Sequence, residues 1–159
     1  MDNKFPGKDI SEEDLKSKFP LAAKKDQNHR SKFIVSGVEF GGNTIPIFAG
    51  PNMVESKELI LDVAKNIKSS GAHFLRGGAF KPLTFPYRNV KYNETREDGI
   101  KWLAEAKEKY NIPIITEIME EKYLDLVSNV ADILQIGSRN MQNYPLITAC
   151  AKTKKPIMI

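Results

Sequence analysis

Two cations stand within one loop near the middle of the sequence. Arg76 and Lys81 follow a short apolar run at residues 72–75, with two glycines between them and two prolines, Pro82 and Pro86, just after. The glycines let the backbone turn sharply or approach a ligand closely, whereas the prolines stiffen the loop. An isolated cation in a loop usually faces solvent, but cations aimed by a stiff backbone suit a phosphorylated or carboxylated small molecule. The combination favours an anion-binding function.

Apolar runs and amphipathic segments alternate on both sides of this loop. Expected strands cover residues 45–49, 72–75, 112–116, 132–136 and 156–159, and expected helices cover residues 55–70, 95–110, 120–130 and 145–152. The continuous apolar run at residues 45–49 predicts a strand covered on both faces. The alternation predicts an α/β fold with a parallel sheet and right-handed crossovers. Two architectures fit this pattern, a doubly wound sheet and a (β/α)8 barrel.

Short local signals predict where several helices begin and end. Ser11 and Asp14 fit a capping box that opens a short helix, and Thr95 and Asp98 fit a second one. Gly71 is the residue expected just after the helix that precedes the central loop.

A turn signal and a change in composition divide the chain. The Ser36-Gly37 pair lies within residues 32–40 and predicts a small β-hairpin. Residues 1–30, which precede it, are polar and rich in lysine. We therefore expect an N-terminal arm at residues 1–30, followed at residues 31–159 by the hairpin and the strand–helix units.

Composition excludes several classes of protein. The chain has 159 residues, 41% of them hydrophobic, and its net charge of +4 comes from scattered lysines rather than the clustered stripe of a nucleic-acid-binding protein. No apolar run approaches ~18 residues, so we expect no membrane span. The single cysteine, Cys150, cannot form an intrachain disulfide and is expected in the core. A cytoplasmic location is therefore expected.

Polar and cationic residues recur after each expected strand. They are Asn52, Arg76, Lys81, Thr84, Glu117, Gly137, Ser138 and Arg139. Both candidate architectures bind ligands at the carboxyl ends of their strands. Any one of these residues would more often be a solvated loop residue, but their shared position predicts a common site. Two arginines and a lysine at that site predict a doubly anionic substrate, such as a phosphate ester with a carboxylate.

One class of ligand is disfavoured at the first strand. Residues 49–53, which follow it, lack the G-x-G-x-x-G pattern of a dinucleotide-binding turn. The sequence therefore argues against dinucleotide binding.

Four stretches carry longer motifs. They are Ala49-Gly50-Pro51 with Val54-Glu55-Ser56, the run LRGGAFKP at residues 75–82 with Thr84, Thr116-Glu117, and the run DILQIGSRNMQN at residues 132–143. Together they resemble the 3-deoxy-D-arabino-heptulosonate-7-phosphate synthases, in the subgroup related to 3-deoxy-D-manno-octulosonate-8-phosphate synthase. Lys81-Pro82 and the residues after Gly137 favour the heptulosonate branch over the octulosonate branch.

This resemblance implies a fold and a reaction. The fold is a (β/α)8 barrel, here truncated after about five strands, with the hairpin near its amino-terminal end. The reaction is an aldol-like condensation of phosphoenolpyruvate with erythrose 4-phosphate, the first step of the shikimate pathway to the aromatic amino acids. In it, C3 of phosphoenolpyruvate attacks the aldehyde, water adds at C2 and phosphate leaves.

The resemblance also implies roles for the cations. Arg76, Lys81 and Arg139 would hold the carboxylate and phosphate of phosphoenolpyruvate, and Arg76 and Lys81 are the expected catalytic residues. Preorganised cations suit this chemistry because negative charge must be held while the new bond forms.

The remaining expected site residues are substrate-binding ones. The backbone at Gly137 and Ser138 would help to bind the phosphate. Pro82 and Thr84 would line the erythrose 4-phosphate side, and Glu117 would act at the site through water.

Three features depart from the family pattern. Asn52 stands where the family has a cysteine that binds a divalent metal, and an amide is a weaker ligand than a thiolate. Leu83 stands where the family has an arginine that meets the sugar phosphate, a lost contact worth roughly 1.5–3 kcal/mol. The sequence stops at Ile159, before the later metal ligands of the family. We therefore assign no metal-ligating residue and no cofactor.

Alternatives of different classes remain open. The chain is either a synthase half-barrel with little turnover of its own, a non-catalytic phosphoenolpyruvate-binding or regulatory half-barrel, or a metal-independent fragment of the octulosonate type. The expected partners are phosphoenolpyruvate and erythrose 4-phosphate, without nucleic acid or membrane. Unpaired edges of the first and fifth strands favour self-association, so a homo-oligomer is a further expectation.

Overall fold

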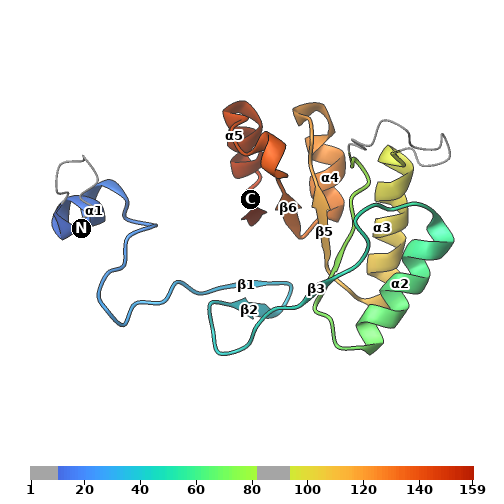
Figure 1. Ribbon diagram of the computed structural model, residues 1–159, viewed down its shortest axis with the longest axis horizontal. Helices are drawn as coiled ribbons and strands as arrows, with labels where there is room; N and C mark the ends of the chain where they lie inside the picture. The colour runs from blue at the N-terminus through green and yellow to red at the C-terminus, as the bar shows by residue number, and fades with distance from the viewer. Residues whose placement is uncertain (1–10, 82–93) are drawn as a thin grey trace, which may run out of the picture.

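A five-stranded parallel sheet is the centre of the computed structural model, which describes residues 11–81 and 94–159 (Figure 1). Its strands are β3 (Phe48–Ala49), β4 (Phe74–Arg76), β5 (Ile114–Glu117), β6 (Ile133–Gln135) and β7 (Ile157–Met158). They lie side by side in sequence order, and every neighbouring pair is parallel. Right-handed crossovers between strands in this order place the connecting helices on one face. The order confirms the parallel sheet and favours the barrel over a doubly wound sheet, whose strand order reverses.

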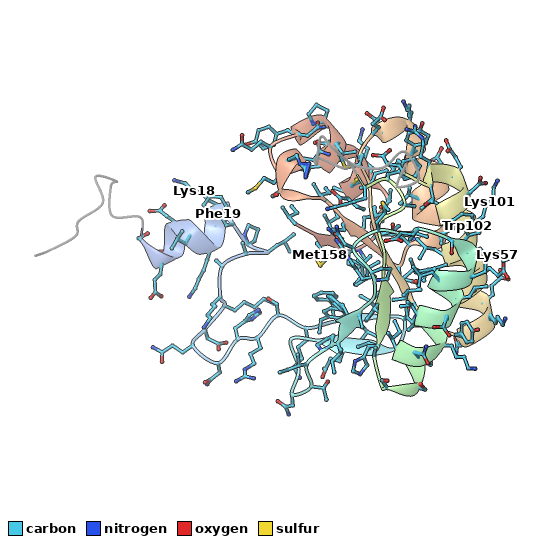
Figure 2. All side chains as sticks on the ribbon, turned by 45° about the vertical axis from the view of Figure 1, so that its right-hand side comes forward. Lys18, Phe19, Lys57, Lys101, Trp102 and Met158 are labelled. Carbon is cyan, nitrogen blue, oxygen red and sulfur yellow. The ribbon has the colours of Figure 1, made fainter. Side chains whose placement is uncertain are left out.

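Helices cover one face of this sheet. They are α2 (Lys57–Ser69), α3 (Arg96–Tyr110), α4 (Leu124–Val130) and α5 (Tyr144–Lys152), with 3-10 turns η1 (Glu121–Tyr123) and η2 (Ser138–Asn140) before α4 and α5. Figure 2 shows Trp102 of α3 and Met158 of β7 on opposite sides of the sheet. The single helix expected at residues 120–130 is wrong in part, because η1 and α4 divide it. Such a 3-10 turn is common at the start of an α-helix.

The predicted helix ends have mixed outcomes. The Ser11 hydroxyl accepts a hydrogen bond from the Asp14 backbone N–H at 3.0 Å, which confirms the first capping box. Gly71 has a φ of 87° and follows α2, as predicted. The second capping box is wrong, because the Thr95 hydroxyl makes no cap bond and instead donates to the Val54 carbonyl at 2.8 Å.

Alternate residues of the strands enter two separate apolar clusters. Those that pack with the helices are Leu75, Ile114 and Leu134. Those on the opposite face, here called the inner face, are Phe74, Ile115 and Ile133. Side chains alternate along a strand, so the residues that directly follow Leu75, Ile114 and Leu134 lie on the inner face. They are Arg76, Ile115 and Gln135.

The predicted hairpin is confirmed, and it covers the amino-terminal end of the inner face. Strands β1 (Phe33–Val35) and β2 (Val38–Phe40) pair antiparallel across the Ser36-Gly37 turn. Both turn residues have positive φ, 48° and 82°, as a two-residue hairpin turn requires. The ring of Phe40 packs edge-on against Phe74, with centroids 5.7 Å apart.

The first strand is shorter and more exposed than its sequence predicts. Only Phe48–Ala49 is a strand, and Ile45 and Ile47 are 83% and 52% exposed. Pro46 has no N–H to donate to a neighbouring strand, and within the described residues β3 pairs with β4 alone. The prediction of a strand covered on both faces is therefore wrong.

The described part of the polar arm, residues 11–30, contains one short helix that stands apart from the sheet. Helix α1 (Glu12–Lys18) has no buried residue, and Figure 1 shows the arm extending away from the sheet. Within residues 11–81 and 94–159, no helix has both the length and the apolar character needed to cross a membrane. Cys150 is buried, as predicted, and burial raises the pKa of its thiol, which disfavours a nucleophilic role.

Candidate functional site

The inner face becomes polar at the carboxyl ends of three neighbouring strands. Arg76 ends β4, Glu117 ends β5 and Gln135 ends β6. Each lies two residues beyond an apolar residue of the inner face, so strand alternation places all three side chains on that face. Glu117 and Gln135 are register partners across the β5–β6 pair.

Protein acceptors on two sides hold Arg76. Its Nε donates to Oε1 of Gln135 at 3.1 Å, and its Nη1 donates to Oδ1 of Asn52 at 3.3 Å. The carbonyl oxygens of Pro51 and Asn52 also accept from Nη1, at 3.4 Å each. Arginine has five N–H donors in a rigid fork, and Nη2 has no acceptor in the described part of the chain. The arrangement fixes the guanidinium while leaving one arm of the fork for a ligand.

A close backbone approach supports this arrangement on the side of β3. Gly50 has a φ of 140°, and a Cβ at this position would lie 2.1 Å from the carbonyl oxygen of Arg76. Only glycine permits both this conformation and this contact.

Lys81 and Glu117 form an ion pair next to Arg76. Their Nζ and Oε2 atoms are 3.6 Å apart, and the two side chains are 20% and 4% exposed. The separation is too long for a direct hydrogen bond, and Oε2 has no hydrogen-bond partner among the described residues. A buried carboxylate needs a counter-charge, so Glu117 keeps the Lys81 ammonium at this end of the sheet.

Gly137 gives the Glu117 carboxylate its space. A Cβ at position 137 would lie 2.1 Å from Oε1 of Glu117, which is far inside van der Waals contact. Gly137 follows β6 and its φ of −66° is open to any residue, so space rather than backbone conformation requires glycine here.

Other predicted site residues have different positions. Ser138 and Arg139 lie in η2 at the same end of the sheet and are exposed. The structure shows no ion pair from Arg139 to the described residues. Pro82 and Thr84 lie outside the residues that the structure describes. The structure thus brings together Arg76, Lys81, Glu117 and Gly137.

Two hydrogen-bond partners of Arg76, Gln135 and Asn52, were not predicted from the sequence. A signal for Gln135 was present, because a lone polar residue stands two positions after Ile133 in an apolar strand. That spacing places it on the same face as Ile133. The contact between Asn52 and Arg76 has no comparable signal, because it depends on how β3 and β4 are aligned.

The described side chains are not suited to bind the divalent metal of the family that the sequence resembles. No group of three or more histidine, cysteine, aspartate or glutamate side chains that could hold a metal ion occurs within residues 11–81 and 94–159. Asn52, at the position of the family's cysteine ligand, instead accepts a hydrogen bond from Arg76. A cation such as Arg76 beside that amide disfavours a metal ion there.

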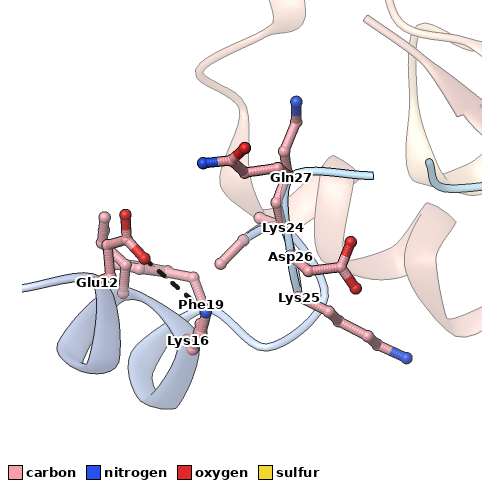
Figure 3. A pocket seen from close by; sticks show the side chains of 10 residues that line it. Glu12, Lys16, Phe19, Lys24, Lys25, Asp26 and Gln27 are labelled. Atoms are coloured by element: carbon pink, nitrogen blue, oxygen red, sulfur yellow. Dashed lines mark ion pairs between the residues drawn. The ribbon is translucent and has the colours of Figure 1, made fainter. Parts of the chain in front are cut away.

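Two hollows in the described part lie away from these strand ends. One, of about 660 Å³, is lined only by residues of the N-terminal arm, among them Phe19 and Lys24 (Figure 3). The other, of about 270 Å³, lies at the opposite end of the strands and includes Lys68 and Lys107. Both lysines donate to backbone carbonyls, at 2.7 and 2.9 Å, and Lys107 also pairs with Asp132 at 2.8 Å.

Comparisons with known proteins agree with this geometry. Residues 19–159 match the profile described as the DAHP synthetase I family. Phospho-2-dehydro-3-deoxyheptonate aldolase of Thermotoga maritima is 38% identical over 122 residues, which cover 77% of this chain and 35% of that protein. 2-dehydro-3-deoxyphosphooctonate aldolase of Fusobacterium nucleatum is 33% identical over 141 residues, which cover 83% and 49%.

Solved structures show the same likeness. The crystal structure of the Thermotoga maritima DAHP synthase superposes with a TM-score of 0.71 at 33% identity, covering 81% of this chain and 36% of that one. A truncated form of the Thermotoga maritima enzyme gives a TM-score of 0.69 at 32% identity and covers 82% and 45%. The chain spans between about a third and a half of the length of these relatives. These similarities confirm the α/β fold of the synthases, and the profile spans most of the sequence. The chain therefore belongs to the DAHP synthetase I family.

Proposed function

We propose that this chain provides the phosphoenolpyruvate-binding half of a synthase that condenses phosphoenolpyruvate with erythrose 4-phosphate. The product would be 3-deoxy-D-arabino-heptulosonate 7-phosphate, at the first step of the shikimate pathway. The observation that carries the proposal is the fixed guanidinium of Arg76 next to the Lys81–Glu117 pair. Family membership supports the same function.

In this proposal, each cation acts on a different part of the substrate. Arg76 offers its Nη2 arm, for which residues 11–81 and 94–159 supply no acceptor, to the carboxylate or phosphate of phosphoenolpyruvate. Lys81 neutralises the negative charge that the attack of C3 develops. Arg139 and the backbone at Gly137 and Ser138 complete the phosphate contacts. Their position after β6, at the same end of the sheet, supports this assignment.

Glu117 has a different role, because a carboxylate repels the anionic substrate. It orients the Lys81 ammonium and accepts a hydrogen bond from the water that adds at C2. Pro82 and Thr84 are assigned to the sugar phosphate from the family motif alone, because they lie outside the described residues. The chain divides into the polar arm at residues 1–30 and the barrel unit at residues 31–159, and we place the protein in the cytoplasm as a homo-oligomer.

The contact of Asn52 favours a second candidate function, that of a metal-independent synthase of the octulosonate type. Its amide binds Arg76 rather than acting as a metal ligand, and a protein named as an octonate aldolase is among the relatives. An octulosonate has eight carbons, three of them from phosphoenolpyruvate, so its acceptor is a five-carbon aldose phosphate such as arabinose 5-phosphate.

Phosphate release from phosphoenolpyruvate tests both candidates, with erythrose 4-phosphate or arabinose 5-phosphate as acceptor. We expect weak turnover that requires erythrose 4-phosphate, because Leu83 removes one contact to the sugar phosphate. Turnover with arabinose 5-phosphate alone would overturn the heptulosonate assignment in favour of the second candidate. Binding of phosphoenolpyruvate with no turnover on either sugar would instead identify a non-catalytic binding protein.

A further inference from the structure

Arg96 has an unusual backbone conformation at the start of α3. Its φ is 48°, in the left-handed region that favours glycine. A side chain at such a position is strained, and the strain persists only where surrounding contacts hold it. The contacts of Arg96 therefore indicate what the residue does.

The guanidinium of Arg96 lies against two aromatic side chains that pack on one another. Its Cζ is 5.6 Å from the ring centroid of Phe80 and 5.2 Å from that of Tyr123, and Nη2 donates to the Tyr123 hydroxyl. The two rings also pack on one another, with centroids 4.5 Å apart. The planar guanidinium stacks on aromatic faces in a way that the ammonium of lysine does not.

Each aromatic partner lies in a segment next to one half of the ion pair. Phe80, 2% exposed, immediately precedes Lys81. Tyr123 ends η1, in the connection that follows Glu117 at the end of β5. The backbone N–H of Arg96 also donates to the Ala79 carbonyl at 2.9 Å, next to Phe80. Arg96 thus joins the β4–α3 loop to the β5–α4 loop.

We propose that Arg96 is a positioning residue, which holds Lys81 against Glu117 by clamping Phe80 to Tyr123. Its effect on phosphoenolpyruvate binding rests on the proposed function, whereas its effect on the ion pair does not. The competing explanation is local: Arg96 would only secure the start of α3, through its own ion pairs with Glu94 and Glu97 at 3.6 and 3.8 Å.

Arg96→Gly separates these explanations. Glycine adopts the same φ without strain, and the side chain is 41% exposed, so its removal leaves no sealed cavity. Arg96→Lys keeps the charge but loses the planar stack. Lys101→Ala is the matched control, because it removes a cation from the outer surface of the same helix (Figure 2).

A double-mutant cycle on urea unfolding tests the ion pair without any ligand. Lys81→Met is made in the wild-type chain and in Arg96→Gly. We expect it to lower the folding equilibrium constant about threefold to tenfold more in the wild type than in Arg96→Gly, which lies within the range of coupling between interacting side chains. Equal losses in both backgrounds would overturn the proposal, because a local role predicts additivity.

Calorimetric titration with phosphoenolpyruvate gives the second readout. We expect Arg96→Gly to weaken binding about threefold to tenfold, Arg96→Lys to lie between it and the wild type, and Lys101→Ala to bind as the wild type does. Equal affinity of Arg96→Gly and wild type would contradict the proposal. If the wild type does not bind, the proposed function fails, and the unfolding cycle alone decides the role of Arg96.

Discussion

Oε2 of Glu117 lies 3.6 Å from Nζ of Lys81, at the carboxyl end of the sheet and with the carboxylate almost fully buried. A buried charge without a partner is destabilising, so replacing either residue alone is expected to lower the stability of the fold. The pair couples the stability of the fold to the geometry of the site. Both the cation that is proposed to meet the substrate and the anion that holds it depend on this contact.

Lys81→Met is expected to destabilise the protein by about 1–3 kcal/mol, because it leaves the Glu117 carboxylate buried and unpaired. Urea unfolding at neutral pH measures the loss. Adding Glu117→Gln to Lys81→Met should recover part of it, since the uncompensated charge is then gone. Lys101→Met, which removes an exposed lysine of α3, is the control and should change stability by less than about 0.5 kcal/mol. A double variant no more stable than Lys81→Met would contradict the role of the pair.

Gly137→Ala is expected to displace the Glu117 carboxylate, because the new Cβ would lie 2.1 Å from Oε1. The loss of unfolding free energy should be about 1–3 kcal/mol, as for other overpacked sites. The same substitution in a Glu117→Ala background should cost little, because the clash is absent. A cost that is the same in both backgrounds would show that Gly137 is needed for another reason.

Asp132 joins the hairpin to the sheet at the end opposite to the site. Its carboxylate accepts from Lys107 Nζ, the Ile114 backbone N–H and the Ser36 hydroxyl, at 2.8, 2.8 and 2.9 Å. Burial raises the pKa of Asp132, but these hydrogen bonds and the Lys107 charge lower the pKa by more, so the net shift is downward. The ionised form therefore stabilises the fold.

Asp132→Asn is expected to cost about 1–2 kcal/mol at neutral pH. Because the folded-state pKa is below the unfolded one, this contribution is complete above about pH 4 and disappears as the pH falls through the folded-state pKa. Urea unfolding of both proteins from pH 7 to pH 3 should show the difference narrowing in acid. Asp62→Asn, on the surface of α2, is the control. A difference that stays constant down to pH 3 would contradict the assignment.

Removal of metal is expected to leave phosphoenolpyruvate binding unchanged. Asn52 binds Arg76 through Oδ1 and is a poor ligand for a transition metal. Titrations in EDTA and in added Mn²⁺ should therefore give affinities within about twofold of each other, less than the value of one net hydrogen bond. Asn52→Ala should weaken binding instead, because it frees one side of the Arg76 guanidinium. A strong dependence on Mn²⁺ would show that metal ligands lie elsewhere in the chain.

Much of the fold was predictable because it depends on local chemistry. The Ser36-Gly37 turn, the end of α2 at Gly71 and the strand–helix alternation each depend on a few neighbouring residues. The exposure of residues 45–47 was not predictable from the run itself, because an apolar run does not show how many neighbours cover it. Thr95 fits a capping box, but a tertiary contact with Val54 takes its hydroxyl.

The site was predictable in its position but not in its contacts. Arg76 and Glu117 follow expected strands, which was enough to place them at one end of the sheet. The hydrogen bonds from Arg76 to Asn52 and Gln135 depend on strand register, which single-sequence patterns do not determine. The left-handed backbone of Arg96 was equally hidden, since arginine is an ordinary residue for the first turn of a helix.

Calorimetric titration of phosphoenolpyruvate into the wild-type chain and into Arg76→Gln measures whether Arg76 binds this substrate. We expect the wild type to bind with a Kd of about 1 mM or below. Arg76→Gln should bind about tenfold to a hundredfold more weakly, the value of one charge-assisted contact. Lys101→Met should match the wild type. No binding by the wild type at millimolar ligand, or an affinity that Arg76→Gln leaves unchanged, would show that Arg76 is not a phosphoenolpyruvate-binding residue.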